Sequence, residues 1–204
     1  SRFAMLSGWR TTTTARIAGR PADRQSVQEL GLAVSDGFFE TMRLPLRRGR
    51  PFVPSDNEAA PKVFAVNDTL ARTLFAGQDP IGQTVTLPEG EGRIVAVVAD
   101  MKYVGLRDPT EPTVFSPWRQ QQHVARAVFV VRTTVPPLSV LPAVRRVVAG
   151  IDSRLPVSDA KTQAAQLDES IRRERGLTTL AVFLALVAVL LSCIGLYGVM
   201  AYHV

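Results

Sequence analysis

The chain has 204 residues, with 24 Lys and Arg against 18 Asp and Glu, which gives a formal net charge of +6 at pH 7. The basic residues are mostly arginines, and they are scattered without interleaved aromatic residues, so the excess charge does not predict a nucleic-acid-binding groove. The lone Cys193 excludes an intrachain disulfide, and His123 and His203 stand far apart, so no clustered metal site is predicted.

The first third of the chain predicts two strands, one short helix and a loop. Residues 11–17 and 27–34 are rich in β-branched and apolar side chains and are expected to be strands. Asp36 is expected to cap a short helix over residues 37–42 by accepting a first-turn amide hydrogen. Residues 54–61 contain Pro, Ser, Asp and Asn, which indicates a surface loop.

A compact passage of strand, helix and hairpin follows. Residues 63–66 are expected to be a buried strand, after which Asn67 caps a helix that Gly77 ends. Residues 85–87 and 94–98 are predicted to be strands that form a hairpin-like connection. The prolines between residues 103 and 117 indicate irregular structure.

Two further short strands, at residues 128–132 and 155–157, flank a predicted helix over residues 139–149. Pro142 falls in the first turn of this helix, where its missing amide hydrogen is tolerated. Strands and helices alternate irregularly and without repeats. We therefore expect an α+β fold with mixed or antiparallel sheets, packed as one or two small lobes over residues 1–161.

The C-terminal part of the chain predicts a coupling helix that leads into a membrane span. A helix is expected to open at Thr162 and to run through residue 176. From Gly176 to Val204 no residue carries a formal charge, and about 20 apolar residues suffice to cross a bilayer. Residues 177–204 are therefore predicted to be a transmembrane helix that contacts the lipid bilayer.

The predicted span carries small residues at spacings of three and four, which place them on one face of a helix. In lipid, helices associate through such close backbone approach. The stripe therefore predicts a packing seam against another transmembrane helix. Its members are Thr178, Ala181, Ala185, Ala188, Ser192 and Gly195.

No stretch of the sequence predicts an enzyme or a cofactor site. Residues 77–84, GQDPIGQT, approach a phosphate-binding loop, but Gln83 stands where the lysine is needed and the loop follows a helix instead of preceding one. Asp100 at the end of an apolar strand is either a site carboxylate or a turn residue. No nucleophile and base are paired in the sequence.

Several motifs together resemble a known family. The segment DGFFETMRLPLRRGRPF at residues 36–52 looks like the stretch SPGYFETMGIPLLRGRDF of the extracytoplasmic core of MacB-type ABC transporter permeases. Matches follow in family order with VNDTLARTLF at 66–75, GQDPIG at 77–82, VVADMKY at 97–103, VVRT at 130–133 and IDSRLPV at 151–157. IGLYGVMAY at 194–202 is similar to the first helix of the FtsX-like permease domain.

The resemblance implies a fragment of a permease subunit in a bacterial inner membrane, with its folded domain extracytoplasmic. The implied partners are the other permease helices, a dimer partner and a cytoplasmic ABC ATPase, and the implied role is mechanotransmission in efflux or extraction. Arg172, Arg173 and Arg175 precede the span and oppose this orientation by the positive-inside rule. The alternative is a single-span membrane-anchored sensor or binding module.

Overall fold

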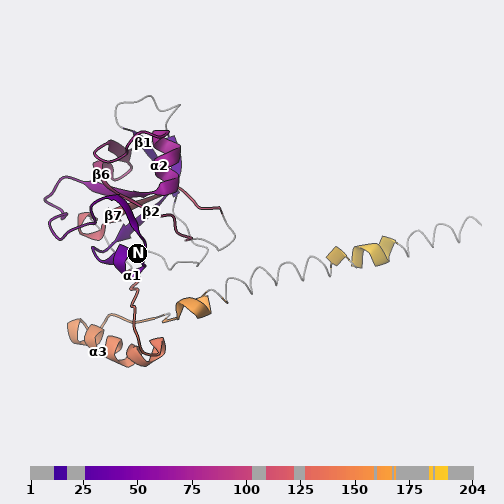
Figure 1. Cartoon of the computed structure of the whole chain (residues 1–204). Coiled ribbons are helices and arrows are strands. Elements are labelled where there is room, and N and C mark those ends of the chain that lie inside the picture. The colour runs from indigo at the N-terminus through magenta and orange to yellow at the C-terminus, as the bar shows by residue number, and fades with distance from the viewer. Residues whose placement is uncertain are drawn as a thin grey trace, which may run out of the picture. The chain divides into compact units, whose positions relative to one another are not determined.

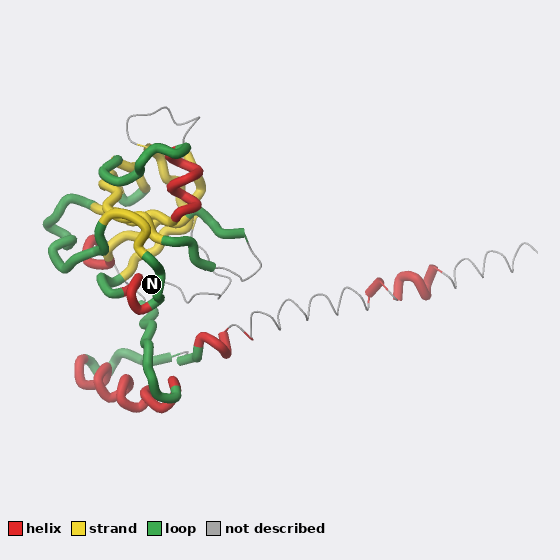
Figure 2. Tube along the Cα trace, viewed as in Figure 1, coloured by secondary structure: helices red, strands yellow, loops and turns green. Residues whose placement is uncertain are grey.

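The computed structural model describes residues 12–17, 26–102, 109–121, 127–158, 160–166, 168, 184–185 and 187–192. The chain divides into two units, residues 1–137 and residues 138–204. All the strands belong to the first unit, whereas the described residues of the second unit form helices and loops (Figure 1, Figure 2).

The first unit is built on one mixed seven-stranded sheet in the order β3-β6-β4-β7-β2-β1-β5. Its strands are β1 (Thr12–Ile17), β2 (Ser26–Val34), β3 (Leu46–Gly49), β4 (Val63–Asn67), β5 (Thr84–Leu87), β6 (Gly90–Val98) and β7 (Thr113–Pro117). The pairs β2–β7 and β4–β6 are parallel, and the other pairs are antiparallel.

An additional pairing between β5 and β6 joins the sheet to itself. Six strands, β4, β7, β2, β1, β5 and β6, therefore follow one another in a ring, which we call the closed sheet. The first residues of β6 pair with β5, and its last residues pair with β3, so β3 adds an edge beyond the ring. Closure gives each strand of the ring a hydrogen-bonded neighbour on both sides.

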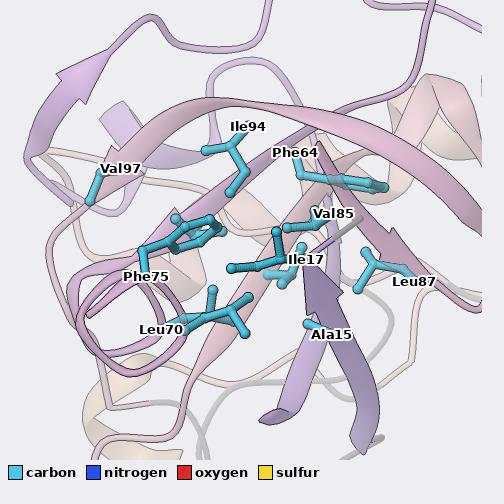
Figure 3. Packing of buried hydrophobic residues seen from close by; sticks show 12 residues of the cluster. Ala15, Ile17, Phe64, Leu70, Phe75, Val85, Leu87, Ile94 and Val97 are labelled. Atoms are coloured by element: carbon cyan, nitrogen blue, oxygen red, sulfur yellow. The ribbon is translucent and has the colours of Figure 1, made fainter. Parts of the chain in front are cut away.

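The core of the closed sheet lies between its strands and helix α2 (Asp68–Phe75). Alternate residues of β4, Phe64 and Val66, belong to this core, and α2 adds Leu70, Leu74 and Phe75. Figure 3 shows Phe64 together with Leu70 and Phe75 of α2. The full cluster is Ala15, Ile17, Phe64, Val66, Leu70, Leu74, Phe75, Val85, Leu87, Ile94, Val97 and Val114.

A second, aromatic cluster fixes the short helix α1 (Phe38–Thr41). The ring of Phe39 lies 5.2 Å from that of Phe115 in β7 and 5.6 Å from that of Phe52, measured between centroids. Phe38 also contacts Phe115, at 6.2 Å. Since both α1 phenylalanines are buried, α1 is held firmly against the sheet.

The mixed sheet confirms the expected combination of strands and helices, but three local predictions were wrong. Residues 113–117, expected to be irregular, form β7, because β2 and β4 supply hydrogen-bonding neighbours on both sides. In the described range 127–158, residues 128–132 and 155–157 form no strand. Among the described residues no strand pairs with those segments, and β propensity alone does not make a strand.

The predicted cap of α1 was also wrong. The residue that precedes α1 is Gly37, which has no side chain to cap the helix. Asp36 instead places its Oδ2 atom 3.6 Å from Nε of Arg119, which follows β7. The short helix η1 (Trp118–Gln120) carries this arginine.

The second unit contains η2 (Pro137–Val140) running into α3 (Leu141–Ile151), which confirms the helix expected at residues 139–149. All the side chains of α3 are described, and none is buried. Residues 163–166 are helical, and the Thr162 hydroxyl oxygen accepts a hydrogen bond from the Ala165 amide at 3.1 Å, so this side chain caps the start of the helical segment. Among the described residues, no helix has the length and apolar content needed to cross a membrane.

Candidate functional site

The structure describes half of the predicted packing seam. Ala185, Ala188 and Ser192 lie in helical segments, 184–185 and 187–192, at the spacing that aligns them on one face. The Ser192 hydroxyl donates a hydrogen bond to the Ala188 carbonyl oxygen at 2.9 Å. Because this bond lies within the helix, the hydroxyl is satisfied without water, which suits a serine in lipid. Thr178, Ala181 and Gly195 lie outside the described residues.

Large apolar side chains surround the described part of the seam. Leu184, Leu190 and Leu191 are each more than half exposed. An exposed run of leucines in a helix requires either lipid or a protein partner to cover it. The described segments are too short to test the predicted span, so the span stays a prediction.

Asp100 has a structural role at the start of α2 and is not an open site carboxylate. Its Oδ1 atom accepts a hydrogen bond from the Thr69 amide at 2.9 Å. Its Oδ2 atom accepts one from the Thr69 hydroxyl at 2.8 Å and one from Arg72 Nη2 at 3.2 Å. An anion at this position stabilises the first turn of the helix. Asp100 thus ties the end of β6 to α2.

Asn67 caps α2 as predicted, and it also joins two strands. Its Oδ1 atom accepts hydrogen bonds from the amides of Leu70 and Thr113, both at 2.9 Å. Its Nδ2 group donates to the Glu111 carbonyl oxygen at 2.9 Å. The side chain is almost fully buried, so these bonds satisfy it without water. The contacts with the strand β7 connect elements 46 residues apart and could not be inferred from the local sequence.

The glycine-rich loop at residues 77–84 is a turn whose backbone amides are already used. The Gly82 amide donates to the Ile94 carbonyl oxygen at 2.8 Å, and the Gln83 amide donates to that of Pro80 at 3.1 Å. A phosphate cradle needs such amides to point at the ligand. The amides of Gly82 and Gln83 are therefore engaged within the fold.

An ion pair between the exposed Arg50 and the buried Asp56, which sequence reasoning missed, fixes the loop at residues 54–61. Two Arg50 nitrogens donate to the two carboxylate oxygens of Asp56, at 2.7 and 2.8 Å. The Val53 amide adds a third hydrogen bond to Asp56, at 2.9 Å. The hydrogen bonds from Arg50 lower the pKa of the Asp56 carboxyl group, and the Val53 amide acts in the same direction. Asp56 is 5% exposed although it lies in a loop, so its role is structural.

In the part of the chain that the structure describes, no three His, Cys, Asp or Glu side chains gather in one place. His123 lies outside the described residues. The observed polar clusters around Asn67, Asp100 and Asp56 are all used internally.

A family model for the MacB-like periplasmic core domain matches residues 4–164, which is more than half of the chain. The chain belongs to the MacB-like periplasmic core domain family. This membership confirms the resemblance that the motifs at residues 36–52 and 66–75 indicated. The match ends before the predicted membrane span, so the similarity of residues 194–202 to an FtsX-like helix stays a prediction.

One curated relative of this MacB-like core domain is the macrolide export ATP-binding/permease protein MacB of Aggregatibacter actinomycetemcomitans. It is 25% identical over 72 residues, which cover 35% of this chain and 11% of the relative. The matched region is thus about a tenth of the length of that relative.

Two solved structures are similar to part of this chain. The periplasmic region of MacB from Actinobacillus actinomycetemcomitans has a TM-score of 0.48 at 14% identity, with 69% of this chain and 63% of that chain covered. The extracellular domain of the noncanonic ABC-type transporter YknZ from Gram-positive bacteria has a TM-score of 0.42 at 16% identity, with 53% and 51% covered.

Proposed function

We propose that this chain is part of the permease subunit of an ABC transporter. Residues 1–161 form an extracytoplasmic core domain, residues 162–176 a coupling helix, and residues 177–204 a transmembrane helix at the start of an FtsX-like permease domain. The observation that carries the proposal is the order of two features. A MacB-like core over residues 4–164 is followed within 12 residues by an uncharged run of 29 residues.

The proposed role is mechanical and not catalytic. The closed sheet, with its buried core and its internally satisfied polar side chains, is a stiff body suited to move as a whole. A helix that runs from Thr162 into the bilayer transmits a displacement between this body and the membrane. The partners that the proposal requires are neighbouring transmembrane helices at the seam, a second permease copy and a cytoplasmic ABC ATPase. The movement drives efflux or extraction of a substrate.

Cross-linking in native membranes tests the proposed seam. In a Cys193→Ser background, a cysteine at Ala188 is expected to cross-link to a second transmembrane helix, because small residues mark the line of closest approach. A cysteine at Leu190, on another face, is the matched control and is expected to react with lipid-soluble reagents only. Equal cross-linking at both positions, or at neither, contradicts the seam and favours a single-span anchor.

Co-purification tests the assignment to an ABC transporter. The membrane protein that carries this chain is expected to bring an ABC ATPase with it in mild detergent, whether as a separate subunit or as a domain of the same polypeptide. A purified complex without an ATPase, or with a signalling domain attached to the span, points to the sensor alternative.

A further inference from the structure

The segment that leads out of the closed sheet carries Arg132, whose side chain is hydrogen-bonded to the C-terminal end of helix α1. Arg132 donates two hydrogen bonds to the carbonyl oxygen of Thr41, from Nε at 2.8 Å and from Nη2 at 2.5 Å. Thr41 is the last residue of α1, and carbonyl groups at a helix end have no partner within the helix. The guanidinium supplies that partner with a charge-assisted, two-pronged contact.

The site that receives Arg132 is rigid. Phe38 and Phe39 bury α1 in the aromatic cluster, and the backbone turns after α1 through hydrogen bonds from the Met42 amide to Phe38 and from the Leu44 amide to Phe39. The Thr41 carbonyl is therefore a fixed point on the first unit. A side chain bonded to it is fixed too.

The segment around Arg132 is not held by apolar burial. Phe129 is 83% exposed, and Val131 and Val135 are each at least half exposed. The first unit ends five residues after Arg132, at Pro137. The intervening residues 133–137 read TTVPP, in which the proline rings fix φ at residues 136 and 137 and leave φ free to rotate at residues 133–135.

We propose that Arg132 is a positioning residue that anchors the exit of the chain from the closed sheet, so that the pivot between the two units lies in residues 133–137. The contact is solvent-exposed, so it opens at a cost small enough for the units to rearrange. Residues 127–132 thereby act as a strap that is closed on α1 and can be released. The inference goes beyond the proposed function and does not require the transporter assignment.

The test measures local exchange and inter-unit distances in the full chain in detergent micelles. Arg132→Met removes every donor but keeps a long apolar stem, Arg132→Lys keeps one donating group, and Arg93→Met removes an equally exposed arginine from β6 as the matched control. Amide hydrogen exchange of residues 127–137 is expected to speed up roughly tenfold in Arg132→Met, less in Arg132→Lys and not in Arg93→Met.

Spin labels attached to Glu58→Cys and Ala149→Cys, in a Cys193→Ser background, report the distance between the units by double electron–electron resonance. The proposal expects Arg132→Met to broaden this distance distribution while the exchange of β4 amides stays unchanged. An unchanged distribution and unchanged exchange overturn it. Faster exchange throughout β4 also overturns it, because Arg132 would then support the closed sheet as a whole and not its exit.

Discussion

Gly49 ends β3 at a point where the chain can carry no side chain. Its φ is +81°, a left-handed conformation that costs other residues about 1–2 kcal/mol. A Cβ atom built on Gly49 would lie 2.0 Å from the Val95 carbonyl oxygen of β6. The same oxygen accepts a hydrogen bond from the Arg50 amide at 3.0 Å. Gly49→Ala therefore has to push the end of β3 away from β6.

The size of the effect follows from two contributions. Left-handed strain costs about 1–2 kcal/mol, and loss of the hydrogen bond to Val95 adds about 0.5–1.5 kcal/mol. Gly49→Ala is thus expected to lower the free energy of unfolding by about 1.5–3.5 kcal/mol. Gly82 is the matched control, since its φ is +82° and nothing lies within 4 Å of an added Cβ. Gly82→Ala is expected to cost the strain alone, about 1–2 kcal/mol.

Thermal unfolding of the full chain in mild detergent, followed by near-ultraviolet circular dichroism of the aromatic cluster, measures both variants. Each kcal/mol corresponds to about 2–4 °C in Tm for a chain of this size. Gly49→Ala is expected to melt about 1–6 °C below Gly82→Ala, since the two differ by the hydrogen bond to Val95. Equal melting temperatures for the two variants would show that β3 does not approach β6 as closely as the structure places it.

Three other substitutions test the structural roles of particular side chains. Because hydrogen bonds from its arginine partner hold the pKa of Asp56 below the usual 3.8, the pair stabilises the fold at neutral pH, and this contribution is lost as the pH falls through the folded-state pKa. Urea midpoints between about pH 6 and about pH 2 should therefore fall more steeply in the wild type than in Asp56→Asn, and parallel curves would refute this. Asn67→Ala is expected to cost about 2–4 kcal/mol in urea unfolding, against about 1 kcal/mol or less for the exposed Asn57→Ala, and similar costs would argue against the buried network. Ala188→Leu is expected to weaken helix association in micelles roughly tenfold, measured by energy transfer between labelled chains, whereas Leu190→Ala should leave it unchanged. Unchanged helix association in Ala188→Leu would contradict the predicted packing seam.

Local signals in the sequence were sufficient for several elements. Residues 11–17 and 27–34 became β1 and β2 within one residue at each end, because β-branched and apolar runs with clear turns on both sides suit paired strands. Asn67 marked the start of α2 because an N-cap asparagine acts on amides only three residues away. Contacts between residues this close in the chain can be predicted from a single sequence.

Elements that depend on distant partners were not predictable in this way. The strand β7 follows Pro112 and ends at Pro117, and only its neighbours β2 and β4, which are far away in the sequence, make it a strand. The opposite error occurred at residues 128–132, where strand propensity is strong but the described structure supplies no partner. Pairing is a tertiary property, so neither outcome follows from the local pattern.

The polar contacts also divide into those that local sequence predicts and those that depend on distant partners. Asp36 was expected to cap α1, but its carboxylate lies beside Arg119, which is more than 80 residues later in the chain. Arg50 and Asp56 are close in sequence, but Asp56 is buried. Its loop is rich in Pro and Ser, and this composition is typical of an exposed loop, so the sequence did not indicate the burial. Sequence composition predicts the average surroundings of an aspartate, and Asp36 and Asp56 both differ from that average.

The membrane orientation of the chain is the central claim, and thiol accessibility in spheroplasts measures it directly. In a Cys193→Ser background, a cysteine at the exposed Glu58 is expected to react with a membrane-impermeant maleimide in intact spheroplasts. A cysteine at His203, at the far end of the predicted span, is expected to react only after the membrane is broken. If the cysteine at Glu58 is protected until lysis, or if both react in intact spheroplasts, the core domain is not on the outer side of a bilayer that residues 177–204 cross.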